Sequence, residues 1–528
     1  MTFYPDWDRV HPEHKWKILR KQKGFIFWAL YSSVGGVMYG FDSGLAGTAT
    51  AFPAFQKQYG RPFTSQPSGY LVPANYQSGW AGASMGGLVV GVMAGGQILE
   101  MIGRKHSLAF GSLVTAVGVA MQVASHEWKL FLAGRLISGA VCSISVTLAM
   151  IGENTRQELR GFFLCLTNGS IVLGQFMLAC ISRGTSTIEG KWSYRTLIIL
   201  QLIFVVVLVG GYPVYPESPY YLLKKGHTEK ARKALNRIHG SKDQTLIDAE
   251  IKRITSNVAF SEEVRVAASR KGPLLVQCFQ GTNLKRTLIA LIPVAGQQLI
   301  GAPFVLSYAT YFLSLIGVRD YFTVSVGLYI VMLLSNISAF FFIETAGRRP
   351  LLVLGTLVLT LILLLMGIVG CFNGHGALWV AVVCMFVWSV AFQLTLGAVG
   401  FAIGSEVTSL PLRASTQSIV GFTQGFAGWL VGFVSPFLIN PDAGNLGAKV
   451  GFVFAGLGVP LCVIFYFLIP ETKGLSFDDM DYLFNNKFSC RNFQSAVKGR
   501  HGSSNDPLTL ESQRQVPGLG SIAVKEEA

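Results

Sequence analysis

Three short charged signatures occur in this chain and then occur again in the same order, about 250 residues further on. Each set contains Gly-Arg followed by a second basic residue, a Glu with an Arg seven residues after it, and Pro-Glu followed by a hydroxyl residue. Mostly apolar sequence lies between them. Repeated charges in a hydrophobic chain predict two related halves that pack within a membrane. The two sets are 103–105, 153 with 160, and 216–218, then 347–349, 406 with 413, and 470–472.

The low charge content indicates the same class. Only 13% of the 528 residues are charged and 51% are hydrophobic, whereas a soluble domain carries about 25% charged residues. The net charge of +15 could indicate a nucleic-acid partner. However, the basic residues gather at the ends of apolar segments and in one central loop, and they form no face interleaved with exposed aromatic residues. We therefore expect a lipid bilayer around the chain and no nucleic acid.

Windows of about twenty predominantly apolar residues indicate transmembrane helices. Twelve such windows, six in each repeat, predict an all-α membrane protein of two pseudo-symmetric six-helix bundles. The first six are expected at about 24–47, 77–99, 107–124, 130–151, 161–182 and 196–215, and the second six at about 286–313, 321–343, 350–371, 377–404, 415–439 and 447–469.

The distribution of Lys and Arg predicts the orientation. They are concentrated before the first span, after the even-numbered spans and in the central loop. Both termini and that loop are therefore expected in the cytoplasm. The expected location is the plasma membrane. We expect a monomer. The predicted parts are a segment 1–23, a bundle 24–216, a central loop 217–285 with short helices, a bundle 286–470, and a tail 471–528 that is mostly disordered after about 487.

The repeated charged residues map to the cytoplasmic ends of the helices. Opposite charges there can form a network between helices that holds the two halves together while the cavity opens outward. The alternative is that each Arg only anchors the topology. The residues of this expected network are Glu100, Arg104, Glu153, Arg160, Glu217, Arg348, Glu406, Arg413 and Glu471.

Several longer motifs resemble those of the sugar porter branch of the major facilitator superfamily, over residues 24–487. Within that branch, the segments at residues 51–57 and 308–312 resemble those of the fungal maltose/α-glucoside:proton symporters. The resemblance implies a two-bundle carrier that works by alternating access. The matching motifs are Gly40-Phe41-Asp42, Gly103-Arg104-Lys105, Pro216-Glu217-Ser218-Pro219, Gln297-Gln298-x-x-Gly301 and Pro470-Glu471-Thr472-Lys473-Gly474.

Asp42 lies in an otherwise uncharged span, where an acid is costly and usually functional. Arg135, in the fourth span, is the strong partner that the first bundle offers within the membrane. In proton-coupled members of the family, an acid and an arginine at matching positions couple protonation to sugar binding, and a proton can be bound and released as their geometry changes. A permanent structural ion pair is the alternative. A proton is thus the expected coupling ion, and no cofactor is expected.

A sugar presents many neutral donors and acceptors around an apolar ring, so its site needs amides and an aromatic face. The resemblance implies that Gln175, Gln297 and Gln298 hold the sugar. Asn168 stands where the family usually has Gln, Gln424 where it usually has Asn, and Phe401 where it usually has Trp. For any one of these residues, packing between helices is the alternative interpretation.

Other positions depart from the family pattern. Pro303 and Met332 stand where sugar-binding Asn residues are common, and Ala398 and Gly400 replace two prolines. Lost amide contacts are costly for a polar ligand. These departures disfavour a simple glucose carrier and leave open a larger, flatter or less polar ligand.

We therefore expect a secondary active carrier that imports a neutral saccharide with a proton, and a di- or oligosaccharide such as an α-glucoside is favoured. A facilitator, or a carrier of another polyhydroxylated compound or secondary metabolite, is the first alternative. A non-transporting sugar sensor is a further alternative. An enzyme is not expected, because no catalytic triad, metal-spaced cluster or phosphate-binding loop occurs, and the isolated cysteines indicate no metal site.

Overall fold

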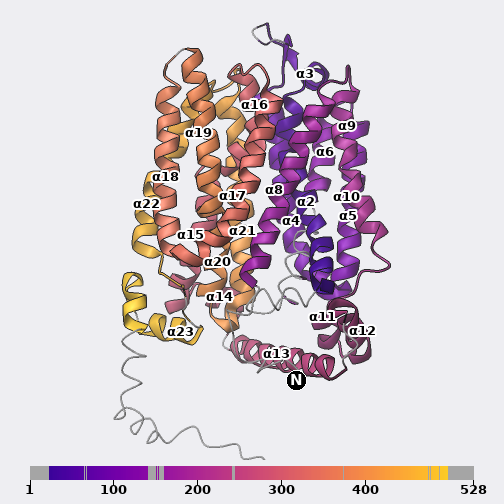
Figure 1. Cartoon of the computed structure of the whole chain (residues 1–528), viewed down its shortest axis with the longest axis vertical. Helices are drawn as coiled ribbons and strands as arrows, with labels where there is room; N and C mark the ends of the chain where they lie inside the picture. Colours follow the sequence, from indigo (N-terminus) through magenta and orange to yellow (C-terminus); the bar gives the residue numbers. More distant parts are fainter. Residues whose placement is uncertain are drawn as a thin grey trace, which may run out of the picture.

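The computed structural model describes residues 23–64, 66, 68–140, 150, 153, 160–240, 244–270, 272–372, 374–473, 475, 477–486 and 488–497. Two helical halves stand side by side, the first drawn in indigo to magenta and the second in orange to yellow (Figure 1). The helices of the first half are α2 (Lys23–Thr50), α3 (Pro53–Tyr59), α4 (Ala74–Ile102), α5 (Arg104–Ala124), α6 (Trp128–Gly139), α8 (Arg160–Thr185), α9 (Trp192–Leu200) and α10 (Leu202–Gly210).

The second half repeats this arrangement. Its helices are α15 (Gly281–Leu299), α16 (Ala302–Leu315), α17 (Tyr321–Ala346), α18 (Arg348–Val369), α19 (His375–Leu394), α20 (Leu396–Val407), α21 (Arg413–Ile439) and α22 (Val450–Leu468). The described helices cover at least part of each of the twelve predicted spans, six in each half. Ten of them, within the described part of the chain, are long and apolar enough to cross a membrane.

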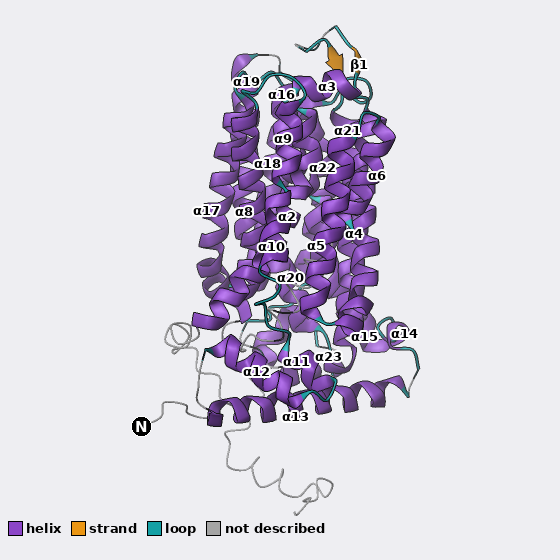
Figure 2. Cartoon of the chain, turned by 90° about the vertical axis from the view of Figure 1, so that its right-hand side faces the viewer, coloured by secondary structure: helices purple, strands orange, loops and turns teal. Residues whose placement is uncertain are grey.

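The remaining helices gather at one end, which we call the basal end; the opposite end, where α3 lies, is the distal end (Figures 1 and 2). The basal helices are α11 (Pro219–Lys224), α12 (Thr228–His239), α13 (Gln244–Ser269), α14 (Leu274–Gln277) and α23 (Phe477–Asn485). There are three short 3-10 turns among the described residues: η3 (Leu410–Leu412), η4 (Gly447–Lys449) and η5 (Cys490–Asn492). A two-stranded antiparallel sheet lies at the distal end and consists of β1 (Arg61–Pro62) and β2 (Tyr70–Leu71).

The outer surface of the halves is apolar. In α18, Leu354, Leu357, Leu361 and Leu365 are all exposed, and their spacing places them on one face of the helix. Leu359, on the opposite face, is fully buried. An apolar surface of this extent is stable against lipid and not against water.

Three spans are interrupted within the part of the chain that the structure describes. The seventh breaks between α15 and α16, where Gly301 adopts a φ of +88° that disfavours a side chain. The tenth breaks at Thr395, and the sixth at Gln201. A break releases backbone carbonyls from the helix and allows them to bind side chains or ligands.

The two halves meet closely at the distal end. The Tyr321 hydroxyl donates to the Ala51 carbonyl at 3.1 Å, which joins α17 to the turn after α2. A Cβ on Gly47 of α2 would lie 1.9 Å from the carbonyl oxygen of Ser307 in α16. Glycine is therefore required at position 47 for the halves to approach to this distance.

Replacing Gly47 by alanine is expected to prevent this distal closure, because backbone atoms cannot move aside as a flexible side chain can. In a cysteine-free background that carries Thr50→Cys as a reporter, Gly47→Ala should increase maleimide labelling of the purified protein. Gly86→Ala is the matched control, since a Cβ there meets nothing within 4 Å. Equal labelling of the two variants would contradict the expectation.

Two expectations about the basal segments need correction. The central loop contains α13, which has 26 residues and contacts η3 of the second half, so its helices are not all short. The ordered part of the tail extends beyond the expected boundary at about 487, because residues 488–497 pack beneath the second half and bury Phe493 and Val497. Such apolar positions are sparse in the tail, which is why composition alone did not reveal them. Residues 1–22 and 498–528 lie outside the described residues.

Candidate functional site

Asp42 and Arg135 form a buried ion pair within the first half. Asp42 lies in α2 and Arg135 in α6, and they are 3% and 1% exposed. Arg135 Nη1 donates to Asp42 Oδ1 at 2.8 Å, and Arg135 Nη2 donates to the Asp42 backbone oxygen at 3.1 Å. The sequence placed both residues in membrane spans, and the structure brings them into direct contact.

Two neutral side chains complete this cluster, and sequence reasoning did not identify them. Ser84 of α4 accepts from Arg135 Nη2 at 2.9 Å, and its Oγ lies 3.4 Å from Asp42 Oδ2. Gln201, at the break in the sixth span, donates to Asp42 Oδ1 at 3.1 Å. Gln201 was visible as a lone amide in an apolar span. Ser84, in a glycine-rich span, carried no such signal.

Some polar atoms around the ion pair are buried and lack a hydrogen-bond partner among the described residues. They include Arg135 Nε, Gln201 Oε1 and the hydroxyl of Tyr308. Tyr308 belongs to α16 of the second half, and the charge of Arg135 acts on its hydroxyl. A buried polar atom without a partner is uncommon. The ion pair of the first half thus lies near α16 of the second half, which packs against α2.

A group of amides crosses between the halves. Asn168 Nδ2 of α8 donates to Gln393 Oε1 of α19 at 3.2 Å, and Asn336 Nδ2 of α17 donates to the same oxygen at 3.4 Å. Gln393 and Asn336 were not identified from the sequence. An Asn or Gln within an apolar span is the signal that could have found them.

The remaining predicted amides lie on separate helices. Gln297 Nε2 binds the carbonyls of Leu396 and Gly397, at 2.7 and 3.3 Å, and so joins the interrupted seventh and tenth spans. Gln175 donates to Ser43 at 3.4 Å, and its Oε1 is buried without a partner among the described residues.

Gln298 packs against α21. A Cβ on Gly428 would lie 3.2 Å from Gln298 Oε1, so the glycine leaves room for this amide. Gln424 is one turn away from Gly428 on the same helix and is half-buried. Gln298 and Gln424 therefore belong to one region of the second half.

For two of the predicted site residues, the structure describes the backbone but not the side chain. The side chains of Phe401 in α20 and Arg160 in α8 lie outside the described residues. A pocket of about 340 Å³ lies at the distal contact of the halves, between Phe52, Arg183 and Tyr321. None of the predicted sugar-binding amides lines that pocket.

The charged signatures form the same arrangement twice at the basal end. In the first half, Arg104 Nε donates to Glu153 at 3.0 Å, and Ser218 Oγ donates to Glu153 at 2.5 Å. Glu217 accepts the backbone N–H of Arg104 at 2.7 Å. Its carboxylate thus binds the N-terminus of α5, where the helix dipole favours a negative charge. Glu100 pairs with Lys224 in an exposed contact at 3.2 Å.

The second half repeats each contact. Arg348 Nη2 donates to Glu406 at 3.1 Å, Thr472 Oγ1 donates to Glu406 at 2.5 Å, and Glu471 accepts the backbone N–H of Arg348 at 3.0 Å. Arg413 begins α21. The contacts described here lie within each half. The sequence had suggested contacts between the halves, which in this conformation are instead made at the distal end.

The distal end carries a buried polar network that the sequence did not reveal. Gln77 of α4 donates to Tyr311 of α16 at 3.1 Å and to Asn440, directly after α21, at 3.2 Å. Asn440 donates to the Val72 carbonyl at 2.9 Å, and Asp442 accepts the backbone N–H of Ala74 at 3.0 Å. Gln77, Tyr311 and Asn440 are at most 2% exposed. This network joins the two halves on the side opposite the charged signatures.

Comparison with known proteins places this arrangement in context. A family model described as Sugar (and other) transporter matches residues 28–484. The MFS transporter fmqE of Aspergillus fumigatus is 29% identical over 514 residues, covering 91% of each chain. The general alpha-glucoside permease of Saccharomyces cerevisiae is 26% identical over 513 residues, covering 94% of this chain and 82% of the permease.

The fold is also similar to solved structures. The structure of the proton:xylose symporter XylE bound to 6-bromo-6-deoxy-D-glucose has a TM-score of 0.70 and 19% identity, and the match covers 88% of this chain and 100% of that one. The xylose transporter XylE from E. coli in a partially occluded inward-open conformation also has a TM-score of 0.70. At this level of identity the likeness establishes the fold of two six-helix bundles.

Proposed function

Because the chain belongs to the sugar (and other) transporter family, whose members are carriers in the membrane and not enzymes, we propose that it imports a neutral saccharide together with a proton. The two halves would rock about a central site, so that the site faces each side of the membrane in turn. The observation that carries the proton-coupling part of this proposal is the buried cluster of Asp42, Arg135, Ser84 and Gln201.

The ion pair supports proton coupling for a physical reason. A buried carboxylate is stable while Arg135 and the hydrogen-bond donors remain in place. Movement of Arg135 away from Asp42 would favour protonation of the carboxylate. The orphaned Tyr308 hydroxyl on the facing helix supplies a link between this change and the movement of the second half. Protonation and alternating access would therefore be coupled through the charge of Arg135, which acts on Tyr308.

The proposed substrate is a di- or oligosaccharide such as an α-glucoside. Among the described residues, those expected to hold it offer neutral amides, which suit hydroxyl groups. The similarity to the general alpha-glucoside permease supports this class. The alternative is a carrier of another polyhydroxylated compound or secondary metabolite, and it is favoured by the buried Met332 and Pro303 at positions where amides are common in hexose carriers.

We further propose that the basal end faces the cytoplasm of the cell and that the plasma membrane is the location. The basic residues of α11–α14 and of the charged signatures support this orientation. The protein would act as a monomer, since each site described above is built within one chain.

Uptake by transporter-deficient cells tests the proposed function. Cells that express the chain should accumulate labelled maltose or another α-glucoside, and a protonophore should abolish accumulation above the external concentration. Accumulation that persists without a proton gradient would exclude proton symport. If no saccharide in a panel of mono- and disaccharides is taken up or competes, the saccharide assignment is lost and the alternative substrate class stands.

Replacing Gln298 by alanine is expected to raise the KM for the saccharide by about three- to tenfold, because a hydrogen bond to a neutral group contributes about 0.5–1.5 kcal/mol. The amide is half-buried beside Gly428. Gln417→Ala is the matched control, since Gln417 lies in α21 and donates to the Gly404 carbonyl at 2.9 Å. Initial uptake rates against concentration would measure both, and equal KM values would remove Gln298 from the site.

A further inference from the structure

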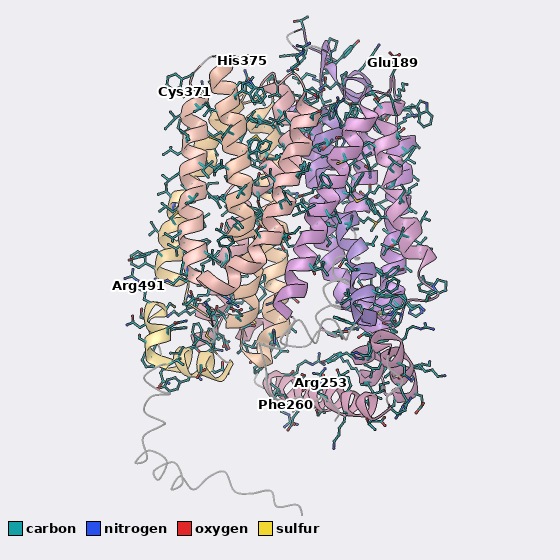
Figure 3. The ribbon with its side chains drawn as sticks, viewed as in Figure 1. Glu189, Arg253, Phe260, Cys371, His375 and Arg491 are labelled. Carbon is teal, nitrogen blue, oxygen red and sulfur yellow. The ribbon has the colours of Figure 1, made fainter. Side chains whose placement is uncertain are left out.

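Basic side chains gather at the basal end of α22. The guanidinium carbon of Arg491 in η5 lies 4.5 Å from the centre of the Tyr466 ring and 4.7 Å from that of Phe467. Arg349, at the start of α18, donates to the Tyr466 backbone oxygen at 3.0 Å. Figure 3 shows Arg491 at the outer edge of the second half, near the basal end. Arg491 thus lies on the surface that surrounds the bundle and not between the halves.

A third cation belongs to the same group. Burial raises the pKa of the Cys490 thiol, and the charges of Lys285 and Arg349 act in the opposite direction. Arg349 binds Tyr466, which Arg491 also contacts. Lys285 adjoins Arg286, whose partner Asp481 lies in α23. Both cations therefore lie close to Arg491. We call Lys285, Arg349 and Arg491 the α22 cation cluster. Three different elements, α15, α18 and η5, bring it together.

The nearby carboxylates are bound elsewhere. Asp481 of α23 pairs with Arg286 of α15 at 2.5 Å. Glu471 accepts the backbone N–H groups of Arg348 and Arg349, at 3.0 and 3.1 Å, so its carboxylate binds the start of α18 and not the Arg349 side chain. Within the described ranges, no ion pair with a carboxylate is found for any member of the α22 cation cluster. Positive charge at this position is therefore available to an external anion.

The position of the cluster matches the edge of the lipid-facing surface. Val459, Val463, Tyr466 and Phe467 lie along one face of α22 and are 57%, 53%, 49% and 63% exposed. This apolar face ends at Phe467, and the cations begin there. Aromatic rings followed by basic residues are typical of the level at which lipid headgroups lie.

We propose that the α22 cation cluster binds the phosphate of an anionic phospholipid headgroup in the leaflet at the basal end. The rings of Tyr466 and Phe467 hold the guanidinium plane of Arg491, and its N–H groups remain available at the edge. Arginine binds phosphate oxygens through such paired N–H groups. The acyl chains of the same lipid would lie along the apolar face of α22.

Binding of this lipid would also hold the basal segment 477–497 in place. Arg491 belongs to this segment, and α23 within it contacts α15 and α20, the basal parts of the interrupted seventh and tenth spans. The lipid site depends on the membrane location of the chain and not on its cargo. A failed uptake assay would therefore leave this proposal standing.

Native mass spectrometry of the full chain, released from vesicles of phosphatidylcholine with phosphatidylserine, tests the site. Wild-type protein should retain phosphatidylserine in preference to phosphatidylcholine. Arg491→Gln is expected to weaken that preference about fivefold, and Lys285→Gln to a similar extent, since a basic side chain near an anionic surface contributes about 1 kcal/mol. Arg491→Lys, which keeps the charge, should retain most of the preference.

Arg265→Gln is the matched control, because Arg265 is exposed on α13 but already pairs with Glu262 at 2.9 Å. An unchanged lipid preference in both Arg491→Gln and Lys285→Gln would overturn the proposal, and so would an equal loss in the Arg265 control. A further measurement adds excess inorganic phosphate as a competitor. If it displaces phosphatidylserine as effectively as soluble anionic lipid does, the cluster is a site for free phosphate and the lipid assignment fails.

Discussion

Cells that express the Asp42→Asn variant are expected to take up substrate only until the inside and outside concentrations are equal. Asparagine keeps the size of the side chain but cannot bind and release a proton. The movement of the halves would then be independent of the proton gradient, so equilibrative exchange should remain while accumulation is lost. Uptake of labelled saccharide with and without a protonophore measures the difference, since only the wild type should respond to the protonophore.

The neutral double variant Asp42→Asn/Arg135→Gln separates coupling from folding. It removes both charges together, so it leaves no unpaired charge in the buried cluster, and it should show the same loss of accumulation. Asp320→Asn is the control, because Asp320 is 58% exposed and pairs with Arg183 only at 3.9 Å. Accumulation that survives in the double variant would mean that the pair is structural and that the proton binds elsewhere.

Replacing Arg135 by alanine is expected to destabilise the protein by about 3–5 kcal/mol, because it leaves a buried carboxylate without its charged partner. The side chains of Arg135 and Asp42 are only 2% and 5% exposed, so solvent cannot compensate for the loss. Two hydrogen bonds to the Asp42 side chain and backbone are lost at the same time. The expected result is a large fall in the temperature of unfolding of the purified protein in detergent.

A double-mutant cycle measures this effect. Adding Asp42→Ala to Arg135→Ala should restore part of the stability, because the uncompensated charge is then gone. Arg183→Ala is the matched control: its partner is exposed, and a pair of that kind contributes about 0–1 kcal/mol. If Arg135→Ala unfolds at the same temperature as the control, Asp42 is not held as a buried ion in the folded protein.

The repeated signatures show how much of the site was readable before the structure. Arg104, Glu153, Arg348 and Glu406 were all expected to belong to a network of opposite charges at the helix ends. In the structure Arg104 contacts Glu153, and Arg348 contacts Glu406. Their exact contacts were not predictable. Glu217 and Glu471 bind helix N-termini, and these bonds depend on how a distant segment returns beneath the bundle.

The amides also show which features the sequence could reveal and which it could not. Asn168 was identified by its position in a recognisable pattern, whereas its partner Gln393, and Asn336, which binds the same Gln393 oxygen, lie on helices of the other half. The distal network of Gln77 and Asn440 likewise joins residues more than 360 positions apart. Whether an amide in an apolar span faces a neighbouring helix or a ligand depends on the rotation of that helix, and hydropathy averages over all its faces.

Hydropathy and the repeated charges alone established the membrane class, the two related halves, the helical content and the isolation of Asp42 in an apolar span. These are local properties, because the cost of burying a charge or of leaving a backbone group unpaired in lipid is set residue by residue. The packed structure decided the partners: Ser84 and Gln201 beside the ion pair, the distal closure at Gly47, and the cations beneath α22. Such contacts arise only when helices distant in the chain adopt a particular rotation and depth, and no single segment carries that information.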